Sequence, residues 1–167
     1  MQTKRMILLA LLTVMAGILH FVEASMPLPI PVPGCKLGLA NIISLYVLMR
    51  FGLKDALCVV VLRVLLGSLL SGMLFSSGFY MSCCGALAAC LLMYLAKRYG
   101  TVFSIVGISV IGAVAHNIAQ LAVASLLINS SAIWYYLPYL ILFALFTGIA
   151  TGLIARYLIT GLNKIGY

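Results

Sequence analysis

Eight polar side chains in or beside long apolar runs are the candidates for chemistry in this sequence. A charged or strongly polar group in apolar surroundings is costly, so its presence there marks a functional site by default. Two of the eight are cations, Lys36 and Arg63, and one is an anion, Glu23. We therefore expect a site that takes a small anionic ligand with a carboxylate or phosphate. The candidate ligand-binding residues are His20, Glu23, Lys36, Asn41, Arg63, His116, Asn117 and Gln120.

The scarcity of acidic residues excludes most carboxylate-dependent chemistry. The chain has ten Lys and Arg but only two acids, Glu23 and Asp55. Two-metal phosphoryl chemistry, glycoside hydrolysis and calcium cages each need several clustered carboxylates. The five cysteines lack metal-ligand spacing, a zinc site has only two imidazoles to draw on, and there is no Walker motif for ATP. The sequence thus predicts no catalytic residue, no metal and no cofactor.

The overall composition predicts an integral membrane protein. Of the 167 residues, 65% are hydrophobic and 7% are charged, whereas a soluble domain averages about 45–50% and about 25%. Disorder is excluded, since it needs low hydrophobicity. The net charge of +8 is spread thinly between apolar runs, which indicates topology-setting loop charges and not a nucleic-acid partner.

Apolar runs divide the chain into six expected membrane-spanning helices in a single domain, residues 1–167. A span needs roughly 20 apolar residues. The sequence has no period-two alternation of apolar and polar residues, so a β-barrel is disfavoured. Four prolines predict a non-helical exterior loop over residues 23–36. The expected spans are residues 6–22, 37–49, 56–75, 79–96, 102–128 and 133–159.

The distribution of basic residues predicts the orientation. Alternate connections carry eight Lys and Arg, and the other set carries only Lys36. The positive-inside rule therefore places both termini in the cytoplasm of a multi-pass cell-membrane protein. An alternative is that the first span is a cleaved signal peptide, because Lys4-Arg5 precedes the apolar run and Val22-Glu23-Ala24 resembles a cleavage site.

Ideal helix geometry brings the candidate residues together in the outer half of the bundle. Arg63 follows Asp55 by eight residues, about 12 Å of rise, which places it near the midplane. His116 and Gln120 share one helix face. These positions predict one cavity that opens outward. Purely structural alternatives remain, in which Arg63 bonds backbone carbonyls and His116 hydrogen-bonds between helices.

Several strings together resemble a known bacterial family across about residues 6–160. They are Pro33-Gly34-Cys35-Lys36-Leu37-Gly38-Leu39-Ala40-Asn41, Gly52-x-Lys54, Arg63 and Gly112-Ala113-x-x-His116-Asn117-x-x-Gln120. The chain resembles the family labelled heptaprenyl diphosphate synthase component I, also called the Gx transporter family. In layout, that family looks like the substrate-capture subunits of energy-coupling-factor (ECF) importers, which have six helices and a first loop that covers an exterior pocket.

The resemblance implies a function and partners. Lys36 and Asn41 would belong to the lid region, and His116, Asn117 and Gln120 to the pocket wall. The protein would lie in a bacterial plasma membrane. A coupling subunit and two ATPases would drive uptake, although Val14 interrupts the Ala-x-x-x-Ala docking pattern that begins at Ala10. The alternative is a non-catalytic membrane accessory protein of prenyl diphosphate or quinone biosynthesis, since one aspartate cannot form two aspartate-rich motifs. A channel is a third option, disfavoured by the sparse acids.

Overall fold

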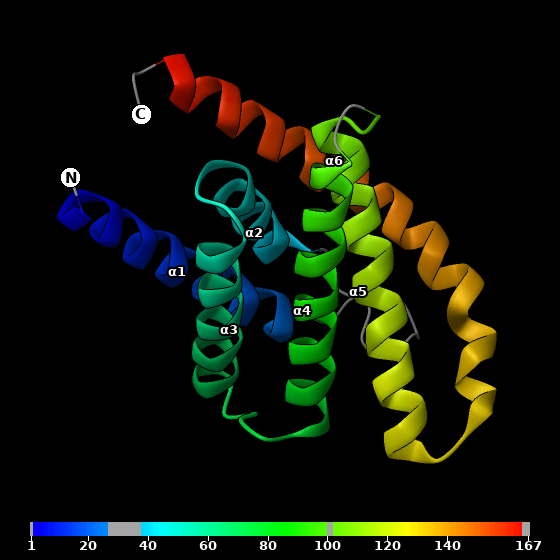
Figure 1. Cartoon of the computed structure of the whole chain (residues 1–167). Helices are drawn as coiled ribbons and strands as arrows, with labels where there is room; N and C mark the ends of the chain where they lie inside the picture. Colours follow the sequence, from blue (N-terminus) through cyan, green and yellow to red (C-terminus); the bar gives the residue numbers. More distant parts are fainter. Residues whose placement is uncertain (1, 27–37, 100–101, 165–167) are drawn as a thin grey trace.

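The computed structural model of the chain describes residues 2–26, 38–99 and 102–164 (Figure 1). These residues form six α-helices and one short 3-10 helix, and they contain no strand, which confirms the prediction of an all-helical fold. In chain order the elements are α1 (Gln2–Ser25), α2 (Leu39–Arg50), α3 (Leu53–Leu70), α4 (Ser77–Arg98), α5 (Ile105–Ile128), η1 (Ser131–Tyr136) and α6 (Leu137–Lys164).

Polar residues next to the apolar runs set several of the helix ends. Ser76 accepts a hydrogen bond from Phe79 N at 3.3 Å and begins α4, and Ser104 accepts one from Gly107 N at 3.1 Å and begins α5. Both are N-caps, because a serine oxygen satisfies an otherwise unpaired backbone N–H. At the other end of α5, Asn129 adopts a left-handed conformation with φ 51° and stops the helix. Helix α3 ends at Leu70, earlier than the expected residue 75.

Four helices of the described residues are long and apolar enough to cross a membrane: α1, α4, α5 and the stretch from η1 into α6. This finding supports a membrane-embedded protein. Helix α2 has 12 residues, about 18 Å of rise against roughly 30 Å of hydrocarbon. Helix α3 carries three charged residues, Lys54, Asp55 and Arg63, in its 18.

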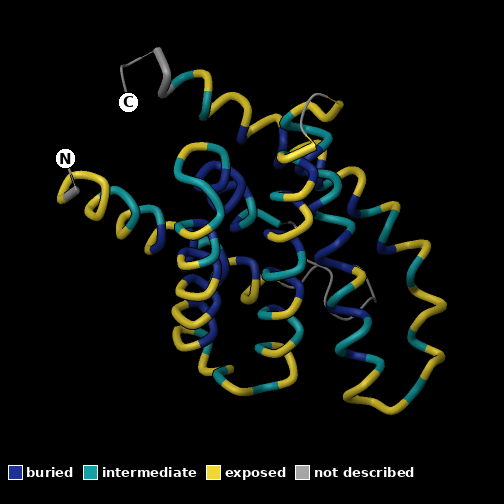
Figure 2. Tube along the Cα trace, viewed as in Figure 1, coloured by how far each residue is buried: buried dark blue, intermediate teal, exposed yellow. Residues whose placement is uncertain are grey.

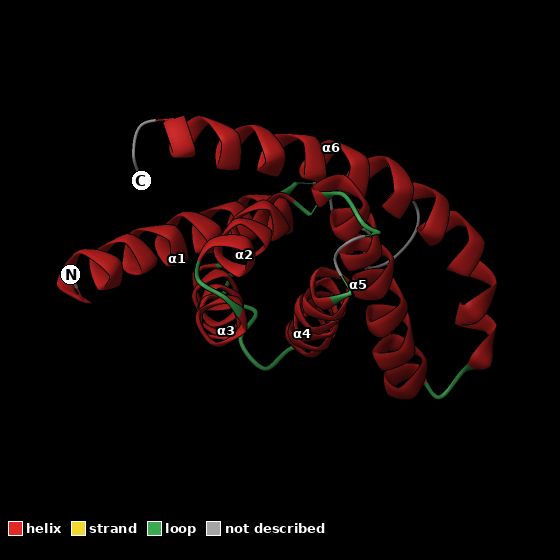
Figure 3. Ribbon diagram, turned by 45° about the horizontal axis from the view of Figure 1, so that its top comes forward, coloured by secondary structure: helices red, strands yellow, loops and turns green. Residues whose placement is uncertain are grey.

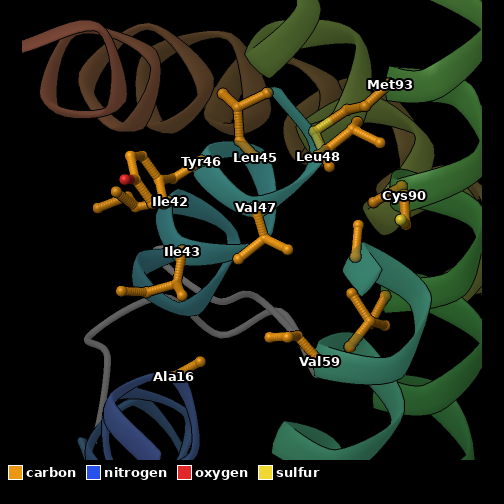
Figure 4. Close-up of a cluster of buried hydrophobic side chains, with 14 of the residues drawn as sticks. Ala16, Ile42, Ile43, Leu45, Tyr46, Val47, Leu48, Val59, Cys90 and Met93 are labelled. Carbon is orange, nitrogen blue, oxygen red and sulfur yellow. The ribbon is translucent and has the colours of Figure 1, made fainter. Parts of the chain in front are cut away.

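The short helix α2 lies at the centre of the hydrophobic core. Eight of its 12 residues are buried, which is expected for a helix that is apolar on all sides. Its side chains Leu45, Val47 and Leu48 point toward α6, α3 and α4 (Figure 4) and are at most 1% exposed. By contrast, α1 and α6 carry long exposed stretches (Figure 2), as apolar helices that face lipid would.

Helices α5 and α6 pack unusually closely along a line of small residues. A methyl group added at Gly148 would lie 2.8 Å from Val110 Cα, and one at Gly152 would lie 2.8 Å from Val106 Cα. The backbones can approach this closely only because glycine has no side chain. A hydroxyl pair, Ser109 Oγ and Thr151 Oγ1, adds a hydrogen bond of 3.0 Å across the same interface.

The connections between helices gather at two ends of the molecule. The start of α1 and the end of α6 lie on one side, together with the α2–α3 turn and the neighbouring ends of α4 and α5 (Figures 1 and 3). The α3–α4 and α5–α6 connections lie at the opposite end. The first group contains Lys4, Arg5, Arg50, Lys54 and Lys97, so we call it the basic end.

Candidate functional site

A network of polar side chains joins the first three helices where α2 begins. Glu23, in the last turns of α1, accepts a hydrogen bond from Leu39 N at 2.7 Å. This carboxylate satisfies one of the unpaired N–H groups at the start of α2 and interacts favourably with the positive end of that helix. Two residues further along α2, Asn41 Oδ1 accepts a hydrogen bond from Arg63 Nη2 at 2.7 Å. The network therefore holds α1, α2 and α3 in one arrangement.

Arg63 is the most deeply placed charge of the network. It is 2% exposed, and the carboxylate of Glu23 attracts it through space. Its Nε has no hydrogen-bond partner among the described residues. A buried guanidinium normally uses its donors fully, because an unpaired buried donor costs about 1–3 kcal/mol. Arg63 thus keeps spare donor capacity beside the start of α2.

Helix α5 contributes three buried polar side chains that face two different neighbours. Gln120 and His116 lie against α4 at Gly85, where an added methyl group would be 2.8 Å from Gln120 Cγ and 3.1 Å from His116 Nε2. Asn117 instead donates from Nδ2 to the Leu140 carbonyl of α6 at 3.0 Å. Asn117 thus forms an interhelical hydrogen bond between α5 and α6.

The larger cavity near these residues has a volume of about 210 Å³ and lies between α1, α3, α4 and α5. His20 and Gln120 line it, together with Ser68 and Ser82, which are 4% and 2% exposed. Three of its four exposed lining residues, Met73, Ser77 and Gly78, lie at the α3–α4 connection, so we place the mouth of the cavity there. The complete lining is His20, Ala24, Ser68, Ser71, Met73, Ser77, Gly78, Phe79, Met81, Ser82 and Gln120.

A second cavity, of about 20 Å³, lies between the start of α2 and helices α4, α5 and α6. Asn41, His116 and Asn117 line it, with hydroxyls from Ser109, Thr147 and Thr151. A polar cavity of this size has room for one water molecule. Asn41 connects it to Arg63, since the same amide oxygen accepts the arginine hydrogen bond.

The structure thus distributes the predicted site residues over three adjoining places instead of one cavity. His20 and Gln120 line the larger cavity, Asn41, His116 and Asn117 line the smaller one, and Glu23 and Arg63 form the network between α1 and α3. Lys36 lies outside the described residues. The charge of the site stays a prediction, because it depends on Lys36 as well as on Arg63 and Glu23.

The residues that sequence reasoning missed are the serines and threonines of the cavity walls. Ser68, Ser82, Ser109 and Thr151 are all buried and line one cavity or the other. A serine in an apolar helix is commonly a packing residue that bonds its own backbone. A serine or threonine in the sequence therefore gives no indication that it lines a cavity. Only the packed structure distinguishes these four residues from the other hydroxyl side chains.

The described part of the chain also contains side chains that can ligate metals or act as thiols. No three His, Cys, Asp or Glu side chains within it gather as a metal-binding group. Its four cysteines are all free, and they range from the buried Cys90 to the exposed Cys58 and Cys84. Cys35, predicted in the exterior loop, lies outside the described residues.

Comparison with known proteins yields one family. The family described as heptaprenyl diphosphate synthase component I matches residues 12–158, which cover most of the chain and include every predicted site residue. No curated protein matches the chain, and no solved structure does either.

Proposed function

The chain belongs to the heptaprenyl diphosphate synthase component I family, and we propose that it is a membrane subunit that binds a small molecule without transforming it. The observation that carries this proposal is the cavity between α1, α3, α4 and α5, whose wall presents buried polar groups inside an apolar bundle. Such groups are costly in a membrane protein unless a ligand or partner uses them. Two acids in the whole sequence leave no means for metal-assisted prenyl transfer.

The cavity wall favours a particular class of ligand. At about 210 Å³ it is smaller than the roughly 300–1,000 Å³ of sites for drug-sized molecules. Hydroxyls, an amide and an imidazole supply hydrogen bonds, while Phe79, Met73 and Met81 supply apolar contact. We infer a compact molecule with several oxygen acceptors on an apolar body, such as a quinone or isoprenoid precursor. Arg63 does not line this cavity, so its charge would attract an anionic ligand there only at longer range.

Uptake is the process that this binding site would serve. We propose six membrane crossings, with the basic end in the cytoplasm and the α3–α4 connection outside, because the positive-inside rule assigns the basic end inward. The mouth of the larger cavity would then face the exterior. No Walker motif occurs in the sequence, so ATP hydrolysis has to come from partner subunits. This arrangement is that of an ECF substrate-capture subunit with a coupling subunit and two ATPases.

The family description favours a second candidate function. A protein named as component I of a synthase would accompany a separate catalytic subunit at the membrane. In that role the cavity would hold a precursor or product of prenyl diphosphate or quinone synthesis, and the chain would remain non-catalytic.

Ligand capture can be tested by native mass spectrometry of the purified full-length protein. We expect a small molecule to co-purify with the wild type, and Gln120→Leu to weaken its binding at least tenfold, a loss of about 1.4 kcal/mol. Asn117→Leu is the matched control, because it removes a buried amide from the same helix without touching the larger cavity. A wild-type protein free of ligand, or equal losses in both variants, would contradict the proposal.

Affinity purification from membranes separates the two candidate functions. Recovery of a transmembrane partner with two ATPases supports uptake. Recovery of a soluble prenyl diphosphate synthase, together with altered prenyl chain length when the gene is deleted, supports the accessory role and contradicts uptake.

A further inference from the structure

The basic end of the molecule contains a second pair of cavities that the proposed ligand site does not use. The first, of about 200 Å³, lies between the start of α1 and the end of α2, and three of its six lining residues are cations: Lys4, Arg5 and Arg50. The second, of about 130 Å³, lies between α2 and α6. Tyr46 and Arg50 line both cavities, so the two adjoin along one face of α2.

The charge in this region is strongly unbalanced. Arg5 forms an ion pair with Asp55 and lies over the Phe51 ring, with 5.7 Å between Cζ and the ring centroid. Asp55 is the only acid in the chain besides Glu23, and Glu23 lies at the other end of α1. Asp55 is thus the one acidic side chain near the three cations that line the first cavity, and Arg50 has an interaction partner of its own. The side chains of Lys4 and Arg50 are exposed, which lets a ligand reach them.

Tyr46 supplies a polar group inside the cavities. Its side chain is 5% exposed, and it lies on the face of α2 that points away from Cys90 and Val59 (Figure 4). Its hydroxyl makes no hydrogen bond with any of the described residues. Because Tyr46 lines both cavities, a phosphate oxygen that enters them would accept a hydrogen bond from this hydroxyl.

The remaining wall of the two cavities is apolar. Leu8 on α1, Met49 on α2 and Ile159 on α6 line it, and all three are half-buried. A free inorganic anion has no apolar part that could contact such a surface. An amphiphile fits both parts, with its phosphate on the cations and its tail on the apolar residues. Basic pockets between helices at a membrane surface commonly bind such head groups.

We infer that the α1–α2–α6 junction at the basic end binds the phosphate head of an amphiphile. Arginine is suited to this task, because its planar guanidinium can bond two phosphate oxygens at once. The head group would be that of an anionic phospholipid or of a prenyl diphosphate, which share the same phosphate chemistry and an apolar tail. This site goes beyond the proposed function, since it lies at the opposite end of the bundle from the mouth of the larger cavity.

Native mass spectrometry of the full-length protein in a neutral detergent tests this inference. The probes are dioleoyl phosphatidylglycerol and farnesyl diphosphate, with dioleoylglycerol and farnesol as tail-matched uncharged controls. At least one anionic amphiphile should bind more tightly than its control, and the tighter of the two identifies the source of the head group. Equal binding of the charged probes and their controls would overturn the inference, and so would inorganic pyrophosphate that binds as tightly as farnesyl diphosphate.

Variants then assign the binding to this junction. Lys4→Gln and Arg50→Gln should each weaken binding about fivefold, and the double variant about 25-fold, since one basic residue near an anionic head group is worth about 1 kcal/mol. Tyr46→Phe should weaken binding by a similar factor, about fivefold, at an unchanged melting temperature. Arg98→Gln removes an exposed cation outside the cavities and is the matched control. If it weakens binding as much as Arg50→Gln does, the assignment is wrong.

Discussion

Glu23 shows how a single residue can serve two parts of the structure. Its carboxylate accepts the Leu39 N–H at 2.7 Å, and its charge attracts the buried Arg63. Loss of the first interaction exposes an unpaired donor at the start of α2. Loss of the second leaves a buried cation with less compensation, although Arg63 keeps its hydrogen bond to Asn41.

Two substitutions at Glu23 separate these contributions. Glu23→Gln keeps an oxygen for Leu39 N but removes the charge, and we expect it to lower the free energy of unfolding by about 1 kcal/mol. Glu23→Ala removes both, and we expect a loss of about 2–3 kcal/mol. Thermal unfolding of the purified proteins in detergent measures the stabilities of the wild type and the two variants. Equal melting temperatures for the two variants would show that the hydrogen bond to α2 contributes nothing.

At the scale of elements, the end of α2 is held by a lysine from another helix. Lys97 Nζ, on α4, donates to the Leu48 carbonyl at 2.9 Å and to the Met49 carbonyl at 3.2 Å. A cation at this position satisfies carbonyls that the helix leaves unpaired and favours its negative end. Helix α2 is therefore fixed at both ends, by Glu23 at the start and by Lys97 at the finish.

The neighbouring residue provides a control for this interaction. We expect Lys97→Met to lower the free energy of unfolding by about 1–2 kcal/mol, because two half-buried carbonyls lose a charged donor. Arg98→Met removes an exposed cation next to it and should change stability by less than about 0.5 kcal/mol. The comparison is made by thermal unfolding, and similar shifts for the two variants would contradict a capping role.

Glycine positions on α6 predict opposite outcomes for the same substitution. Gly148→Ala places a methyl group 2.8 Å from Val110 Cα, so α5 and α6 must separate, at a cost of about 1–3 kcal/mol. Gly161→Ala, on the same helix, meets nothing within 4 Å and should be neutral or slightly stabilising, since alanine favours helix by up to about 1 kcal/mol. Melting temperatures that fall equally in both variants would show that close packing at Gly148 does not matter.

At the scale of the whole molecule, the two ends of the bundle differ in charge and in the proposed ligands. The basic end carries most of the cations among the described residues, whereas the α3–α4 and α5–α6 connections carry none (Figure 1). If the bundle sits in the membrane as proposed, a ligand that enters the larger cavity and an amphiphile at the basic end approach from opposite sides of the bilayer.

Single cysteines in a cysteine-free background test this orientation. A membrane-impermeant maleimide should label Ser131→Cys, in the exposed start of η1, on intact cells. It should label Arg98→Cys, at the exposed end of α4, only after the membrane is permeabilised. The reverse pattern would invert the orientation and place the mouth of the larger cavity inside the cell.

Composition alone determined that this chain is helical and membrane-embedded. The hydrophobicity of a segment depends only on its own residues and not on what packs against it. A helix likewise satisfies its backbone hydrogen bonds within the segment. Both properties can therefore be predicted without a tertiary structure. The same reasoning selected polar residues that are costly in apolar surroundings, and His20, Glu23, Arg63, His116 and Gln120 each prove to be buried.

Only the tertiary structure decided which of these residues share a cavity. That depends on the rotation and spacing of the helices, which glycines such as Gly67 and Gly85 set by allowing His20 and Gln120 to approach α3 and α4. No periodicity within one helix encodes this, since it arises from contacts between segments far apart in the chain. For the same reason the cavity serines, the pairing of Arg63 with Asn41 and the basic junction around Tyr46 emerge only when the helices are packed together.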